Sequence, residues 1–242
     1  MCYICSKSIN LHYTDTKKIN KMIKIENIET KRTARYATYG NLDEKTTDVW
    51  FVIHGYGQLV EFFIKKFTFL NPENNFVVAP EALSRHYLNG KDNKVGAVWM
   101  TKEDRENEVK DYVNYLQTLQ NTLLGTGTHT YRIHILAFSQ GCSTAWRWVN
   151  AGNTKADSLI LWAGDFAHEI DYTKIPIRFP LMKILYVYGL QDEVLSDWQT
   201  YEVLEQKIKD MQFLLSKVIS FEGKHELNQH ILKEVETFVT QK

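Results

Sequence analysis

The chain has 242 residues, of which 44% are hydrophobic and 24% are charged, as is typical of a chain that folds around a core. The chain has 29 basic residues (lysine plus arginine) and 29 acidic residues (aspartate plus glutamate). No net charge therefore favours binding to nucleic acid or to an anionic membrane surface. No apolar run reaches the ~18 residues of a membrane span, and the start lacks the pattern of a secretion signal. With three cysteines we expect no disulfide framework and a reducing, cytoplasmic setting.

The beginning of the chain separates into a patternless segment and a patterned one. Residues 1–21 are polar, and we expect them to form a loose extension. Residues 22–28 and 33–39 partly alternate apolar and polar side chains, which suggests an opening hairpin. From there strands and helices alternate, so we expect one α/β domain with a mostly parallel sheet over residues 22–242.

The first strongly apolar run, residues 48–53, ends in a glycine-containing sequence, His54-Gly55-Tyr56-Gly57-Gln58. Glycines let the backbone approach a ligand closely and present its N–H groups. The N–H of Tyr56 is therefore a candidate donor to a developing oxyanion. A dinucleotide-binding turn does not fit, because Val60 stands where the third glycine of that motif belongs.

A strand at residues 75–80 and a helix at residues 102–123 enclose a long segment without a regular pattern. Loops of this length in a compact domain are often functional, so this one could form the wall of a cleft. Trp99 and Met100 near its end are candidate substrate contacts, with core packing as the equal alternative.

The most informative motif of the chain is Ala137-Phe138-Ser139-Gln140-Gly141, between an apolar strand at residues 131–136 and a helical pattern at 142–149. A small-x-Ser-x-Gly sequence at a strand-to-helix turn is typical of the nucleophile elbow of serine hydrolases. Ser139 is therefore the candidate nucleophile, and the N–H of Gln140 is the other candidate oxyanion donor. Phe138 is a candidate apolar wall for an acyl chain.

An acidic residue and a histidine follow in the chain order that this elbow requires. Asp192 comes shortly after the apolar run 181–189, and His225 follows the strand pattern 217–221. Both lie just beyond the carboxyl ends of strands, where open parallel sheets build their sites. His225 could take the serine proton while Asp192 orients the imidazole; Glu193 is an alternative acid.

Together these motifs resemble the phospholipase/carboxylesterase branch of the α/β hydrolases, to which acyl-protein thioesterases belong. The resemblance implies an α/β-hydrolase fold, with about eight mostly parallel strands and helices on both faces. It also implies hydrolysis of carboxylic esters or thioesters without a metal or other cofactor. The residues that it carries over are Ser139, Asp192 and His225 for catalysis and Tyr56 and Gln140 for the oxyanion hole.

The sequence therefore predicts a serine hydrolase that cleaves small or medium acyl esters of a small-molecule substrate through an acyl-enzyme on Ser139. A binding protein that keeps the fold but not the catalysis is the alternative, since fold alone does not settle function. Only residues 165–180 separate two predicted strands at the point where related folds insert a lid. We therefore expect a minimal lid or none, and an open cleft.

Overall fold

The computed structural model describes residues 23–88, 93–125, 130–198 and 201–241, with the backbone alone for 196–198 and 201. The chain divides into two units, residues 1–33 and residues 34–242. Residues 23–33 form no helix or strand, and Ile23, Ile25 and Ile28 are exposed. Over the described residues the predicted opening hairpin is therefore wrong, because only its second segment contains a strand, at residues 36–39. The predicted extension, residues 1–21, lies outside the described residues.

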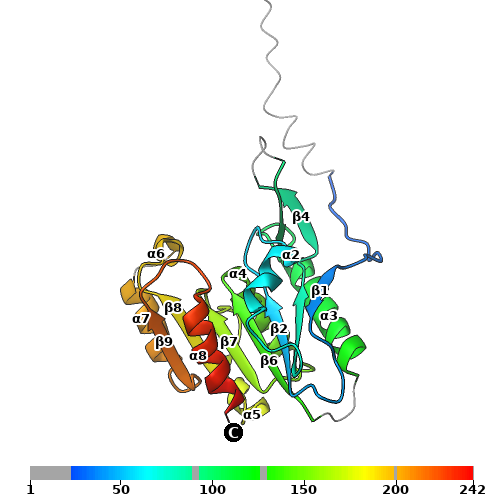
Figure 1. Cartoon of the computed structure of the whole chain (residues 1–242). Helices are drawn as coiled ribbons and strands as arrows, with labels where there is room; N and C mark the ends of the chain where they lie inside the picture. Colours follow the sequence, from blue (N-terminus) through cyan, green and yellow to red (C-terminus); the bar gives the residue numbers. More distant parts are fainter. Residues whose placement is uncertain (1–22, 89–92, 126–129, 199–200, 242) are drawn as a thin grey trace, which may run out of the picture. The chain divides into compact units, whose positions relative to one another are not determined.

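Seven strands of the second unit form one sheet, in the order β1-β3-β2-β6-β7-β8-β9 (Figure 1). All neighbours are parallel except β1, which runs antiparallel to β3. The strands are β1 (Tyr36–Tyr39), β2 (Asp48–Ile53), β3 (Asn75–Pro80), β6 (Arg132–Phe138), β7 (Ser158–Trp162), β8 (Lys183–Gly189) and β9 (Lys217–Phe221). The predicted mostly parallel sheet is confirmed, with seven described strands in place of about eight, because the segment expected to open it forms no strand.

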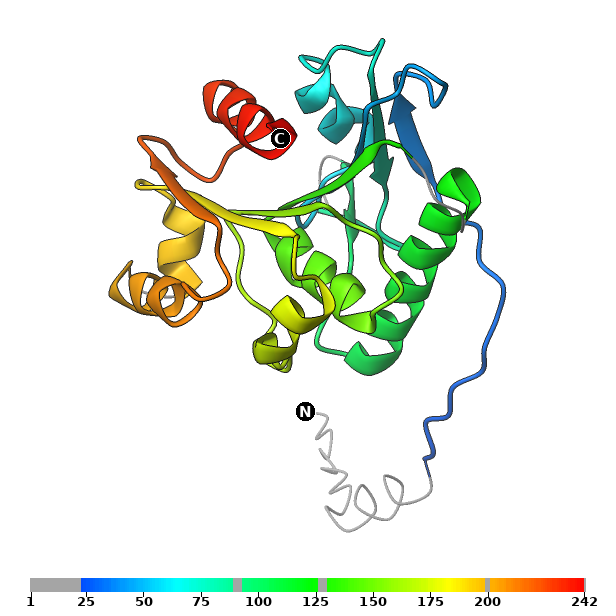
Figure 2. The same ribbon diagram turned by 90° about the horizontal axis from the view of Figure 1, so that it is seen from below.

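Helices cover both faces of this sheet (Figure 2). On one side lie α2 (Val60–Phe63), η1 (Ile64–Phe67) and α8 (Gln229–Thr240); the Gln229 side-chain amide donates to the Lys66 carbonyl and joins α8 to η1. On the other side lie α3 (Arg105–Leu124), α4 (Gln140–Ala151), α6 (Glu193–Trp198) and α7 (Tyr201–Asp210). Because helices enclose both faces, every residue of β2 and β7 is buried, and all of them except the first, Asp48 and Ser158, are apolar.

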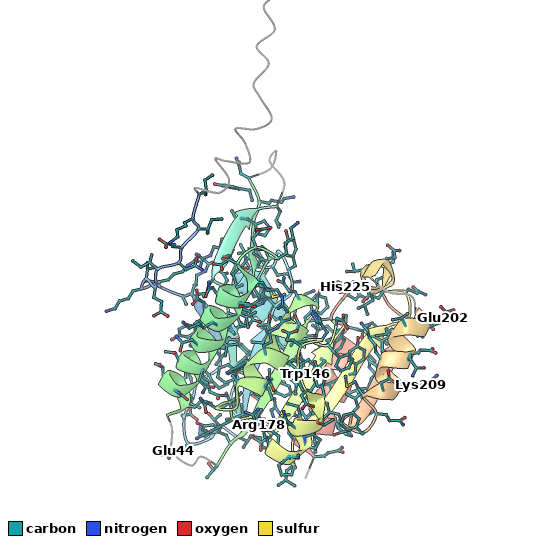
Figure 3. All side chains as sticks on the ribbon, turned by 180° about the vertical axis from the view of Figure 1, so that it is seen from behind. Glu44, Trp146, Arg178, Glu202, Lys209 and His225 are labelled. Atoms are coloured by element: carbon teal, nitrogen blue, oxygen red, sulfur yellow. The ribbon has the colours of Figure 1, made fainter. Side chains whose placement is uncertain are left out.

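Two connections differ from simple strand-to-helix turns. Between β3 and α3 the chain forms an antiparallel hairpin of β4 (Ser84–Tyr87) and β5 (Val95–Val98), where the sequence predicted a loop. Between β7 and β8 it forms η2 (Tyr172–Lys174) and α5 (Ile175–Arg178). Tyr172 packs edge-on against Trp146 of α4, one of the largest buried side chains (labelled in Figure 3). None of the described helices has the length and apolar character needed to cross a bilayer.

The strand order reverses at the centre of the sheet, where β2 lies beside β6. From β2 the chain proceeds outward to β3, and from β6 it proceeds the other way to β7. The last residue of β2, Ile53, is paired in register with Ala137, the next-to-last residue of β6. The loop after β2 and the turn after β6 therefore start side by side, at the switch point where open α/β sheets bind their ligands.

Candidate active site

Ser139 occupies the turn between β6 and α4 in a conformation that only a tight turn explains. Its φ of 54° and ψ of −122° are unusual for a residue with a side chain, and its N–H donates to the Trp162 carbonyl over 2.8 Å. A side chain at Gly141 would meet the Ile53 carbonyl oxygen at 2.6 Å, so only glycine fits there. These constraints give the small-x-Ser-x-Gly sequence its physical basis.

The structure brings Ser139, His225 and Asp192 into one line of hydrogen bonds. The Nε2 atom of His225 lies 2.9 Å from the Ser139 Oγ, and its Nδ1 lies 2.8 Å from the Asp192 Oδ2. An ionised carboxylate can only accept, so Nδ1 carries the proton and Nε2 accepts the serine hydroxyl proton. This is the geometry that a general base needs to activate a serine.

Asp192 is the acid that faces His225, and the adjacent Glu193 is not. Asp192 is fully buried, and its Oδ1 accepts from the Leu195 N–H over 2.9 Å. The Glu193 side chain is 81% exposed and pairs with Lys224 over 3.6 Å. Of the two acids that the sequence left open, the structure therefore places Asp192 against the imidazole.

Backbone contacts fix the distance between the acid and the histidine. In the loop after β8, the N–H of Leu190 donates to the Phe221 carbonyl and that of Gln191 to the Gly223 carbonyl, each over 2.9 Å. A side chain at Gly189 would collide with the Gly223 carbonyl, so the two loops can pack this closely only with glycine there. His225 consequently lies at the carboxyl end of the sheet (labelled in Figure 3), with its ring 4.8 Å from that of Phe138.

The two candidate oxyanion donors lie beside the serine. Gln140 is the first residue of α4, so its N–H has no partner within the helix and lies at the positive end of the helix dipole. Within the described residues, the N–H groups of Gln140 and Tyr56 donate to no acceptor. The loop that carries Tyr56 is held on both sides: the Gln58 side chain accepts from the Gly55 N–H, and the Gly57 N–H donates to the Ala97 carbonyl, both over 2.8 Å.

His54 anchors the same loop from beneath. Its Nε2 accepts from the Ala82 N–H over 3.0 Å, so its Nδ1 carries the proton and donates to the Gly55 carbonyl over 2.7 Å. Burial lowers the pKa of His54 to about 4, because the charged form would lose its hydration. His54 is therefore neutral at physiological pH and ties β2 to the segment after β3.

Two cavities border this loop. The smaller, of about 220 Å³, contains the serine and is lined by Tyr56, Ser139, Gln140, Ser143 and Asp165. The larger, of about 570 Å³, is mainly apolar and lies between α2–η1 and the β4–β5 hairpin. Its lining residues are Gly57, Gln58, Leu59, Phe62, Phe63, Lys66, Leu88, Lys94 and Val95. The adjacent residues Tyr56 and Gly57 thus belong to different cavities.

The three predicted substrate contacts line neither cavity. Phe138 and Trp99 are buried, and Trp99 donates its backbone N–H to the Gln140 side chain over 3.1 Å. The Gln140 amide in turn donates to the Met100 carbonyl over 2.9 Å. Of the two interpretations of Trp99 and Met100, their contacts fit structural packing, since they hold the residue after the nucleophile.

Sequence reasoning missed Ser143 and Asp165. It predicted that the segment between residues 80 and 101 could form the wall of a cleft, and Leu88, Lys94 and Val95 of that segment line the larger cavity. Ser143 lies about one helical turn beyond the nucleophile, on the same face of α4. Asp165 follows the carboxyl end of β7, the same position relative to a strand that identified Asp192 and His225. The rule that functional residues follow the carboxyl ends of parallel strands could have found Asp165. No sequence motif predicts the short elements around the larger cavity.

A serine turn, a histidine and an acid at the carboxyl ends of a mostly parallel sheet define the α/β-hydrolase class. Residues 45–230 match the family described as serine hydrolase (FSH1), which is more than half of the chain. The chain therefore belongs to the FSH1 serine hydrolase family. Comparison with curated proteins finds no matching sequence.

Solved structures share the fold at low sequence identity. Acyl-protein thioesterase 2 of Zea mays superposes with a TM-score of 0.63 at 15% identity, over 86% of this chain and 98% of the other. A phospholipase/carboxylesterase of Dyadobacter fermentans gives 0.61 at 13%, over 89% and 100%. Esterase PE8 gives 0.60 at 18%, over 86% and 98%. The resemblance predicted from the motifs is confirmed at the level of the fold.

Proposed function

We propose that the protein is a serine esterase, which cleaves carboxylic esters of a small-molecule substrate, and thioesters by the same chemistry, through an acyl-enzyme on Ser139. The observation that carries this proposal is the hydrogen-bonded line from Asp192 through His225 to Ser139, which ends in a cavity. Family membership and the esterases among proteins of the same fold support it. The proposed mechanism requires no metal or other cofactor.

Acylation follows from the protonation states of the line. The Ser139 Oγ attacks the ester carbonyl carbon while its proton passes to His225 Nε2, and Asp192 stabilises the imidazolium that forms. The negative charge that develops on the carbonyl oxygen is held by the N–H groups of Tyr56 and Gln140, and one such donor is worth about 10² to 10³ in rate. When the carbon–oxygen bond to the alcohol breaks, His225 returns the proton to the leaving oxygen.

Deacylation repeats these steps with water as the nucleophile. A water molecule takes the place of the alcohol, and His225 Nε2 removes its proton as it attacks the acyl-enzyme carbonyl. The second tetrahedral intermediate collapses to release the acid and to restore the Ser139 hydroxyl. The same histidine thus serves as base and acid in both halves of the reaction.

The larger cavity is the proposed site for the acyl chain. It begins at Gly57, next to the proposed donor Tyr56, and is formed mainly by apolar side chains such as Phe62, Phe63 and Leu88. Burying hydrocarbon there is favourable by about 0.8 kcal/mol per methylene group. The proposed substrates are therefore esters of small to medium aliphatic acids, and their chain lies along the oxyanion loop.

A panel of 4-nitrophenyl acetate, butyrate and octanoate, with the butyrate thioester of thiophenol, tests this function. We expect the wild type to hydrolyse the panel, and an acid-quenched sample to carry the acyl group on the peptide that contains Ser139. Ser139→Ala should lower kcat by at least about 10⁴-fold with an unchanged circular-dichroism spectrum. A folded wild type that binds these esters without turnover would instead support the non-catalytic binding protein.

A further inference from the structure

The structure assigns a specificity-determining role to Asp165, a residue that the proposed mechanism does not use. Asp165 lines the same cavity as Ser139 and follows the carboxyl end of β7. We propose that its carboxylate selects esters whose alcohol part carries a positive charge over those whose alcohol part is anionic. This inference rests on the proposed esterase function, and it names the class of substrate that the serine cavity would accept.

The backbone before Asp165 is held against the nucleophile. Ala163 has a φ of 51°, which is uncommon for a residue with a side chain, and its N–H donates to the Val187 carbonyl over 2.8 Å. A side chain at Gly164 would collide with the Ser139 carbonyl oxygen. Unfavourable φ values persist only where the surroundings enforce them, and they concentrate at functional sites. The loop after β7 is therefore built to pass directly beneath the serine turn.

The core side of this loop is equally fixed. The buried Tyr186 hydroxyl donates to the Gly164 carbonyl over 2.8 Å. The Phe166 ring stacks on that of Tyr186, with 5.4 Å between centroids and 13° between planes. Residues on both sides of Asp165 are thus anchored to β8, so the position of Asp165 at the cavity wall is determined by the sheet.

The carboxylate itself is oriented by two contacts. Its Oδ1 accepts from the Phe166 N–H over 2.8 Å, and the Lys207 ammonium of α7 lies 2.9 Å from Oδ1 and 3.1 Å from Oδ2. The Asp165 side chain is 45% exposed, and Lys207 does not line the cavity. Of the two partners of this ion pair, Asp165 therefore lines the cavity and Lys207 does not. A carboxylate oxygen has lone pairs left for a substrate donor or cation.

This arrangement suits the alcohol part of an ester. The acyl chain is assigned to the larger cavity across the oxyanion loop, which leaves the smaller cavity, with Asp165 in its wall, for the leaving group. A cation there would be attracted to Asp165, whereas an anion would be repelled, and at the effective dielectric constant of a protein surface each effect amounts to about tenfold in rate. High salt would weaken both effects, because the pair is partly exposed.

The test uses three butyrate esters of matched shape, whose alcohols are choline, 3,3-dimethylbutanol and 2-hydroxyethanesulfonate, with butyrate release followed by pH-stat. We expect the wild type to hydrolyse them in the order cationic, neutral, anionic. Asp165→Asn should lower the ratio of kcat/KM for the choline ester to that for the sulfonate ester by about a hundredfold, because each ester contributes about tenfold. Lys207→Met should raise the same ratio severalfold, because it leaves the carboxylate uncompensated.

The two variants separate recognition from a structural role of the ion pair. If the pair only held α7 against the loop, both variants would change all three esters alike, and the ratio would stay constant. A constant ratio in active enzyme overturns the inference about Asp165 and leaves the esterase proposal standing. A wild type that hydrolyses none of the three, nor the aryl esters, overturns the esterase proposal itself. Should Asp165→Asn fail to fold, the rise expected for Lys207→Met decides alone.

Discussion

The two cavities on either side of the oxyanion loop differ in how they are built. Around the smaller one, the chemical groups come from the turns after β2, β6, β7, β8 and β9, five parallel strands of one sheet. The larger one is bounded by short elements outside that sheet, namely α2, η1 and the β4–β5 hairpin. The register of the sheet fixes the first cavity, whereas the packing of side chains on short elements shapes the second.

The two cavities correspond to two tasks, the chemical reaction and the selection of the acyl chain. Groups that exchange protons must be held within a few tenths of an ångström, and the paired carboxyl ends of parallel strands provide that precision. A hydrocarbon chain needs only a space of suitable size and apolar lining, which short elements can supply. Changes to the proton-transfer residues at the first cavity should therefore abolish turnover, and changes around the second cavity should alter which acyl chain is preferred.

The largest effect is expected on the acid side of the proton-transfer line. Asp192→Asn keeps the shape of the side chain, but its amide favours the wrong tautomer of His225, so kcat should fall by about 10⁴-fold. Glu193→Gln is the matched control, because that side chain is 81% exposed and pairs with Lys224, and it should stay within about twofold of wild type. Steady-state kinetics with 4-nitrophenyl butyrate provide the comparison. A larger loss in Glu193→Gln would reassign the acid.

The stability of the fold should fall in acid because of His54, which holds the oxyanion loop between the two cavities. Its folded pKa of about 4 lies below the unfolded value of about 6.5, so the unfolded chain binds the proton first as the pH falls. Stability due to neutral His54 is complete above pH 6.5 and is lost between there and pH 4, by about 3 kcal/mol.

Urea unfolding of wild type and His54→Gln between pH 7 and pH 4 measures this contribution. The wild type should lose about 3 kcal/mol more of its unfolding free energy than the variant over that range. Parallel pH profiles for the two proteins would show that His54 is not the buried neutral group described here.

A smaller effect is expected at the larger cavity. Leu88→Trp should fill part of that space and exclude about two methylene groups of a long chain, which lowers kcat/KM for the octanoate ester about tenfold relative to the acetate ester. Leu181→Trp adds the same bulk at a residue that is 92% exposed in the turn before β8, and serves as the control. Equal effects of Leu88→Trp on both esters would place the acyl chain elsewhere.

Sequence reasoning succeeded where a residue type is dictated by backbone geometry. The buried parallel strands appear as apolar runs, and β3 and β9 occur at the predicted positions, residues 75–80 and 217–221. The small residues of the serine turn are required by the approach of Gly141 to β2, so the motif can be recognised locally. Acid and base could be ranked because they follow strands that end at the same edge of the sheet.

It failed where tertiary contacts decide. Ile23 and Ile25 alternate with polar residues like a strand, yet they and Ile28 are exposed, and β1 takes β3 as its partner instead. The β4–β5 hairpin has four residues in each strand and only a half-buried first strand, too little to generate a pattern. Trp99 and Met100 could belong to a cleft or to the core, and only their contacts with Gln140 distinguish the two.

The central claim, that His225 and Asp192 make Ser139 nucleophilic, is tested most directly by a fluorophosphonate probe. The wild type should be labelled at neutral pH within minutes, on the tryptic peptide that contains Ser139, and the folded Ser139→Ala and His225→Ala variants should remain unlabelled. Labelling of wild type on another residue, or no labelling of folded wild type at all, would contradict the account.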